Sequence, residues 1–162
     1  MKKILVIQNK RIGDVLIASL IAANIKQLFP NSRVDYFVYD YTTGVIENNP
    51  NIDRIIPINE KELKKIPNLL KITRHLRKKN YDIIFDPYSK FQSKFISFFS
   101  KATIRVGYQK KGKTSIFNPY THNVHPLEKK TMPCGKSIEQ RVQLVYTVFP
   151  LETPIYTPKI YL

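Results

Sequence analysis

Residues 3–30 read KILVIQNKRIGDVLIASLIAANIKQLFP, and the fold class can be predicted from them. The continuous apolar run within residues 3–8 is typical of a β-strand that is covered on both faces. Apolar residues then recur at helical spacing over residues 14–28, and Pro30 closes the segment. A buried strand that leads directly into a helix is the opening unit of a parallel α/β sheet.

The same alternation of strands and helices continues along the 162-residue chain. Further strands are predicted over residues 34–39, 54–58, 81–86 and 103–106, and helices over residues 42–48, 67–79, 89–101 and from Ile138 to Phe149. Residues 108–135 contain several prolines and glycines, which predicts a long irregular connection. Five strands that alternate with helices predict a Rossmann-like parallel sheet with helices on both faces, and strand 3–8 at or near its centre.

The chain is strongly basic, with 27 Lys and Arg against 12 Asp and Glu and a formal net charge of +15. Residues 1–60 are nearly neutral, whereas residues 61–79 hold eight basic groups and one acidic group, and residues 90–136 hold ten and one. This asymmetry favours an anionic partner such as nucleic acid, a phosphorylated lipid or a membrane surface. The 61–79 run is equally typical of a solvated helix face or of a helix attracted to anionic lipid.

Several classes of protein are excluded by simple counts. No run of about 18 apolar residues is present, so no membrane-spanning helix is predicted. The N-terminal apolar run is too short for a signal-peptide core, and a cytoplasmic location is expected. Cys134 is the single cysteine, which excludes an internal disulfide. His122 and His125 lie three apart, but only Glu128 is near them, so no metal site is predicted.

The first turn, Asn9-Lys10-Arg11-Ile12-Gly13-Asp14, is the candidate functional loop. Ligands of parallel sheets bind at the carboxyl ends of the strands, where this turn lies. It lacks a GxGxxG pattern, so a dinucleotide fingerprint is absent. Gly13 permits a tight turn or the close approach of a ligand. Asp14 either begins a helix, where the dipole favours a carboxylate, or accepts a proton from a sugar or lipid hydroxyl.

This turn and its flanks resemble the ADP-heptose:lipopolysaccharide heptosyltransferases, glycosyltransferase family 9. In that family a Gly-Asp-Val-Leu turn preceded by arginine follows the first strand; the matching residues here are Arg11, Gly13, Asp14, Val15 and Leu16. Two further stretches resemble the family in place and order: NPNIDRIIPI, residues 49–58, and LRKKNYDIIFDPYSKFQSKFISFFSKATIRVGY, residues 76–108. One departure is Asp86-Pro87-Tyr88, where many members have Asp-x-Gln.

The resemblance implies a GT-B enzyme, in which two Rossmann-like domains face a cleft. Residues 1–150 would be the N-terminal acceptor domain, residues 151–162 would begin the interdomain linker, and the C-terminal donor domain would be absent. A nucleotide-sugar donor resembling ADP-heptose is expected on that missing domain, and no cofactor is expected in this fragment. Asp14 matches the general base of an inverting transfer of heptose to the lipopolysaccharide inner core. The isolated fragment is expected to be inactive.

The resemblance also implies a ligand for the basic loops, namely an anionic glycolipid or core oligosaccharide. The resemblance and the charge pattern together predict six acceptor-binding residues: Lys10, Arg11, Gly13, Lys110, Lys111 and Lys113. Peripheral contact with the inner face of the cytoplasmic membrane is expected, and nucleic acid is not. The alternative is a basic nucleic-acid-binding α/β module without catalytic activity, although no helix-turn-helix, zinc-finger or RNP pattern is present. Helix 89–101 carries Phe91, Phe95, Phe98 and Phe99, which are predicted to be core residues.

Overall fold

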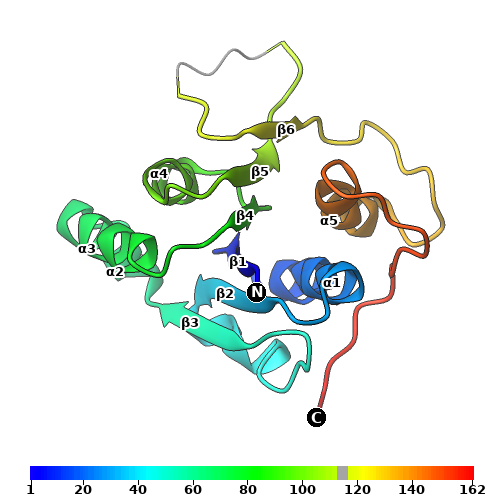
Figure 1. The fold of residues 1–162 in the computed structure, drawn as a ribbon, viewed down its shortest axis with the longest axis horizontal. Helices are drawn as coiled ribbons and strands as arrows, with labels where there is room; N and C mark the ends of the chain where they lie inside the picture. Colours follow the sequence, from blue (N-terminus) through cyan, green and yellow to red (C-terminus); the bar gives the residue numbers. More distant parts are fainter. Residues whose placement is uncertain (113–116) are drawn as a thin grey trace.

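The computed structural model describes residues 1–112 and 117–162, and these form a parallel sheet with helices on both faces (Figure 1). The strands are β1 (Lys3–Gln8), β2 (Arg33–Tyr39), β3 (Arg54–Ile58), β4 (Ile83–Asp86), β5 (Ile104–Tyr108) and β6 (His122–Val124). The α-helices are α1 (Ile12–Leu28), α2 (Glu60–Leu63), α3 (Ile66–Arg77), α4 (Phe91–Phe99) and α5 (Lys136–Tyr146), and η1 (Asp40–Val45) is a 3₁₀ helix. The strand order is β3-β2-β1-β4-β5-β6, with every neighbouring pair parallel.

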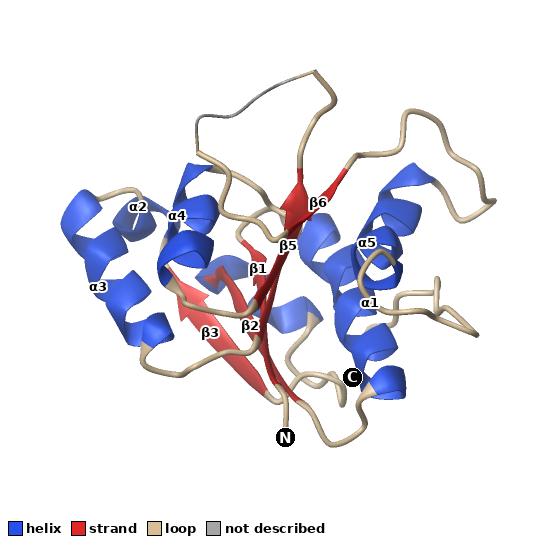
Figure 2. Cartoon of the chain, turned by 45° about the horizontal axis from the view of Figure 1, so that its top comes forward, coloured by secondary structure: helices blue, strands red, loops and turns tan. Residues whose placement is uncertain are grey.

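The sheet separates two layers of helices. Helices α1 and α5 pack together on one face, and α2, α3 and α4 cover the other (Figure 2). β1 lies inside the sheet between β2 and β4, and its side chains from Ile4 to Gln8 are all buried. The predicted Rossmann-like fold and the interior position of strand 3–8 are therefore confirmed.

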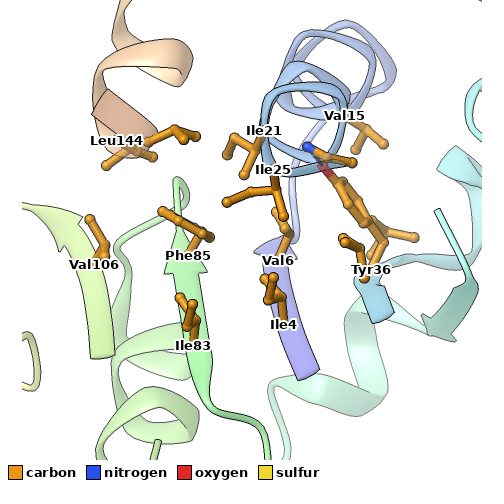
Figure 3. Close-up of a cluster of buried hydrophobic side chains, with 14 of the residues drawn as sticks. Ile4, Val6, Val15, Ile21, Ile25, Tyr36, Ile83, Phe85, Val106 and Leu144 are labelled. Atoms are coloured by element: carbon orange, nitrogen blue, oxygen red, sulfur yellow. Dashed lines mark hydrogen bonds between the residues drawn. The ribbon is translucent and has the colours of Figure 1, made fainter. Parts of the chain in front are cut away.

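The alternating side chains of β1 anchor a hydrophobic core on each face. Ile4 and Val6 join the cluster under α1 and α5, whereas Leu5 and Ile7 join the cluster under the opposite helices. Figure 3 shows the first cluster, in which Tyr36 reaches from β2 to α1. Its hydroxyl donates to the Ala18 carbonyl at 2.8 Å, so the one polar atom of this buried ring is satisfied.

The structure differs from the sequence prediction in three places. The short helix α2 precedes the predicted helix 67–79, and the Asn59 side chain caps it by accepting from the Lys61 and Glu62 N–H groups. β6 lies inside residues 108–135, which were predicted to be irregular; three residues are too few for a visible alternation, and β6 forms because Val106 and its neighbours on β5 pair with it. The predicted helix 42–48 is the 3₁₀ helix η1. Of the described residues, no helix is both long and apolar enough to cross a membrane.

The C-terminal residues 151–162 run back along α1 (Figure 1). The Asn24 side chain on α1 accepts from the Ile155 N–H at 2.8 Å and donates to the Ile155 carbonyl at 3.0 Å. Asn24 is fully buried, so this pair of hydrogen bonds ties the tail to the first helix.

Candidate active site

A groove of about 790 Å³ opens at the carboxyl edge of the sheet, where the loops after β1, β4 and β5 meet. It is lined by Lys10, Pro87, Tyr88, Ser89, Lys90, Lys94, Tyr108, Gln109, Lys110, Gly112, Pro126, Gln140 and Arg141. Five of these described lining residues are Lys or Arg, and none of them is acidic. The groove therefore has the charge and the position in the sheet that suit an anionic ligand.

Asp14 lies at the border of this groove, in the first turn of α1. The Lys10 Nζ atom is 3.3 Å from its Oδ1, and the Arg141 Nη2 atom is 3.6 Å from the same oxygen. Both cations line the groove, so the carboxylate is held beside it. The Asp14 side chain is 26% exposed, which leaves it accessible to a substrate hydroxyl. Its place in the first turn of α1 also suits a carboxylate electrostatically.

Arg141 connects Asp14 to the floor of the groove. This α5 residue is buried, and its Nη1 donates to the Tyr108 hydroxyl at 3.2 Å. The guanidinium also lies over the Tyr108 ring, 5.8 Å from its centroid, and the Tyr108 hydroxyl donates to the Gln140 carbonyl at 2.6 Å. Burial raises the pKa of Tyr108 to about 12, so the phenol stays protonated at neutral pH. These contacts fix the guanidinium in one orientation toward Asp14.

Asp86 ends β4 near the groove but has a structural role. Its carboxyl is fully buried and accepts from the Tyr120 hydroxyl at 2.5 Å and from the Ser89 N–H at 2.8 Å. Burial raises the pKa of Asp86 to about 6, although these hydrogen bonds oppose the shift. Gly107 on β5 is required here, because a Cβ at that position would overlap the Tyr120 ring. Asp86 thus fixes the segment before β6 to the sheet.

Comparisons with known proteins find relatives that match parts of this chain. No protein-family model matches the sequence. The chain is 30% identical over 77 residues to lipopolysaccharide heptosyltransferase 3 of Escherichia coli K12, which covers 46% of this chain and 22% of the relative. It is 28% identical over 95 residues to lipopolysaccharide heptosyltransferase 1 of Campylobacter coli, covering 59% and 28%. The resemblance to the lipopolysaccharide heptosyltransferases is confirmed.

Solved structures support the same fold. A glycosyl transferase family 9 structure from Veillonella parvula DSM 2008 matches 99% of this chain and 44% of its own, with a TM-score of 0.82 and 20% identity. The E. coli heptosyltransferase WaaC with ADP matches 96% of this chain and 50% of its own, with a TM-score of 0.75 and 16% identity. This chain therefore spans about half the length of these heptosyltransferase-like structures, and at such identities the likeness establishes the fold.

The structure brings together only part of the predicted acceptor site. Lys10 and Lys110, which are 100 positions apart in the sequence, both line the groove. Arg11, Gly13 and Lys111 are exposed but are not among the lining residues, and Lys113 lies outside the described residues. A Cβ on Gly13 would meet no described atom within 4 Å, so the protein itself does not require a glycine there.

Four further residues of the site lie outside the sequence prediction. Lys90 and Lys94 line the groove but belong to a basic region whose individual residues the sequence does not assign to a ligand. Tyr108 also lines the groove, although it begins the segment that is predicted to be irregular.

Arg141 occupies a buried position on α5, next to Val142, and Glu139 is buried on the same helix. A buried arginine needs a hydrogen-bond or charge partner, so an arginine beside apolar residues of a predicted helix is a candidate site residue. Its partners, Asp14 and Tyr108, are distant in the sequence and are identified only by the structure.

Proposed function

We propose that this chain is the acceptor-binding part of a heptosyltransferase-like glycosyltransferase. The enzyme would transfer a heptose from a nucleotide-sugar, with inversion, to an anionic lipopolysaccharide core. One observation carries the proposal: a partly exposed carboxylate, Asp14, is held by Lys10 and Arg141 at the border of a cationic groove. The heptosyltransferase relatives named above support the choice of reaction.

The chemistry follows from the geometry around Asp14. An acceptor hydroxyl placed at the groove border would lose its proton to the Asp14 carboxylate as its oxygen attacks the anomeric carbon of the nucleotide-sugar. The bond from that carbon to the diphosphate oxygen breaks at the same time, and the nucleoside diphosphate leaves with its electron pair. Lys10 and Arg141 contact only Oδ1, which leaves Oδ2 for the substrate among the described contacts. Lys90, Lys94 and Lys110 would bind the phosphates or carboxylates of the acceptor and orient the hydroxyl.

The donor half of the reaction belongs to a second domain in this proposal. A nucleotide-sugar would be bound by a donor domain that faces the carboxyl edge of the sheet, as the two-domain resemblance implies. Residues 1–150 would then bind the acceptor, and residues 151–162 would lead toward the donor domain. We further propose a cytoplasmic enzyme that contacts the inner membrane surface peripherally.

Calorimetry on the 162-residue chain tests acceptor binding. A phosphorylated core oligosaccharide should bind, with affinity that falls as salt rises, and ADP-heptose should bind weakly. Replacing Lys94 and Lys110 by Gln should weaken oligosaccharide binding by about tenfold, by analogy with the loss of charged contacts at other binding sites. Lys71→Gln, an exposed α3 residue outside the groove, is the matched control. Tight donor binding, or equal losses in both variants, would contradict the proposal.

Asp14→Asn tests the catalytic role. In an enzyme that joins this chain to its donor domain, turnover should fall by roughly two to four powers of ten, the usual contribution of a general base. Acceptor binding should change little, because Asp14 would act in the proton transfer. Turnover within about threefold of the parent enzyme would assign the base elsewhere. Submicromolar, salt-resistant binding of random oligonucleotides would instead favour the nucleic-acid alternative.

A further inference from the structure

Helix α4 buries polar serine side chains and exposes most of its phenylalanine rings. Its serines face the sheet, with Ser93 and Ser97 fully buried. Its phenylalanines point the other way: Phe91 is 58% exposed, Phe98 48% and Phe99 38%. The prediction that these aromatic residues form core is therefore wrong for three of the four rings, and only Phe95 packs partly against the core. Small side chains let the helix approach the sheet closely, and the rings are left outside.

The three exposed rings and two half-buried ones form one continuous surface. Phe91 contacts Phe95 with ring centroids 6.3 Å apart, Phe95 contacts Phe99 at 4.7 Å, and Phe99 contacts Phe98 at 5.0 Å. Phe98 also contacts Phe117, from the segment between β5 and β6, at 5.1 Å. We call these five rings the α4 aromatic surface. Figure 1 shows α4 at the periphery of the molecule, beside the loop that follows β5. An exposed aromatic patch of this kind marks an interaction site.

The positive charge of the segment that contains α4 indicates an anionic partner. Residues 87–127 contain seven Lys or Arg and no Asp or Glu. Lys90 is the N-cap residue of α4, Lys94 lies on the helix, and Lys101 follows its C-terminal end. A lipid bilayer with anionic headgroups offers an apolar layer directly beneath a layer of phosphates. Aromatic rings enter the interfacial region of such a bilayer, and flexible lysines reach the headgroups.

We propose that the α4 aromatic surface docks this protein on an anionic membrane. The basic helix α3, for which a solvated face or membrane contact is predicted above, carries the exposed residues Ile66 and Leu70 but no Phe, Tyr or Trp. Residues 91–99 combine four aromatic rings with Lys94, so α4 has both properties that the interface requires.

The docking surface adjoins the groove. Lys90 and Lys94 line the groove and also flank Phe91 on α4. A docked protein would therefore hold the groove next to the headgroup layer, where the sugar of a glycolipid could enter it while the acyl chains stay in the bilayer. The docking deepens the peripheral membrane contact of the proposed function by naming the surface that makes it, and the entry of the sugar into the groove rests on the proposed acceptor binding.

Vesicle co-sedimentation tests the docking without any acceptor. The chain should bind vesicles of phosphatidylcholine mixed with phosphatidylglycerol and should bind vesicles of phosphatidylcholine alone much more weakly. Phe91→Ser together with Phe98→Ser should weaken binding to the mixed vesicles by about tenfold or more, because two rings no longer enter the interface. The matched control is Tyr146→Ser on α5, a ring that is 42% exposed on the opposite face of the sheet. Urea unfolding of each variant checks that the fold is retained.

Three outcomes would overturn the docking proposal. They are no binding to the mixed vesicles, an equal loss in the Tyr146→Ser control, or full binding by the folded double variant. Sedimentation velocity adds a further check: self-association that the double variant loses, without vesicle binding, would assign the surface to a second copy of the chain. Since the vesicles contain no glycolipid, failure here leaves oligosaccharide binding in the groove untouched, and failure of oligosaccharide binding leaves the docking result untouched.

Discussion

The two faces of the sheet are covered in opposite ways. Under α1 and α5, sixteen buried apolar residues form one cluster, of which α1 contributes four and α5 two. Under α2, α3 and α4 the corresponding cluster has eleven, and α4 contributes only Ile96. The helices on the α1 side thus bury more apolar side chains against the sheet. On the other side, α4 buries few apolar side chains and exposes most of its phenylalanine rings. Because the exposed rings of α4 do not pack against the core, they are available to contact a partner.

The largest difference should appear when one phenylalanine is removed from each face. Phe85→Ala, in the cluster under α1, should lower the free energy of unfolding by about 3–5 kcal/mol, because it leaves a cavity in a fully buried site. Phe91→Ala on the exposed side of α4 should change it by less than about 0.5 kcal/mol. Urea unfolding measures both. Similar losses for the two variants would show that the α4 rings do support the core.

Asp86 provides a pH-dependent test on the α4 side of the sheet. Its folded-state pKa of about 6 lies above the usual value of 3.8, so its proton is held more tightly in the folded state. The stability from this carboxyl is fully present below pH 4 and is lost as pH rises through 6, by up to about 3 kcal/mol. Asp86→Asn should remove this decline when unfolding is measured from pH 4 to pH 7.

Tyr120→Phe is a second variant for the same test, because it removes one hydrogen bond to the Asp86 carboxyl. The Tyr120 hydrogen bond lowers the Asp86 pKa against the effect of burial, so its removal should move the decline to higher pH. An unchanged pH profile in both variants would mean that another group is responsible for the decline.

The smallest expected effect concerns the close approach of β5 and the Tyr120 ring. Gly107→Ala should lower the free energy of unfolding by about 1–3 kcal/mol, because the added methyl group overlaps that buried ring. Gly44→Ala is the matched control, since its Cβ would meet no described atom within 4 Å. Thermal unfolding compares the two variants. A neutral Gly107→Ala would show that the segment before β6 adjusts easily and that this side of the sheet is loosely held.

Local patterns determined most of this protein's fold. The apolar run at residues 3–8, the helical period that follows it and the repeated alternation were enough to predict a parallel sheet with β1 inside it. This succeeds because backbone geometry links each element to a periodicity of a few residues. The turn at Asp14 was also recognisable, because its residues are contiguous and resemble those of the heptosyltransferases.

Tertiary structure alone decided which side chains meet. It paired Asp14 with Arg141, brought Lys10 and Lys110 to one groove, and added β6 to the edge of the sheet. It also turned the phenylalanines of α4 outward, although their spacing predicted a buried face. Periodicity identifies the residues that share a helix face, but the side chains opposite determine which face can approach the sheet. That selection depends on packing between distant segments.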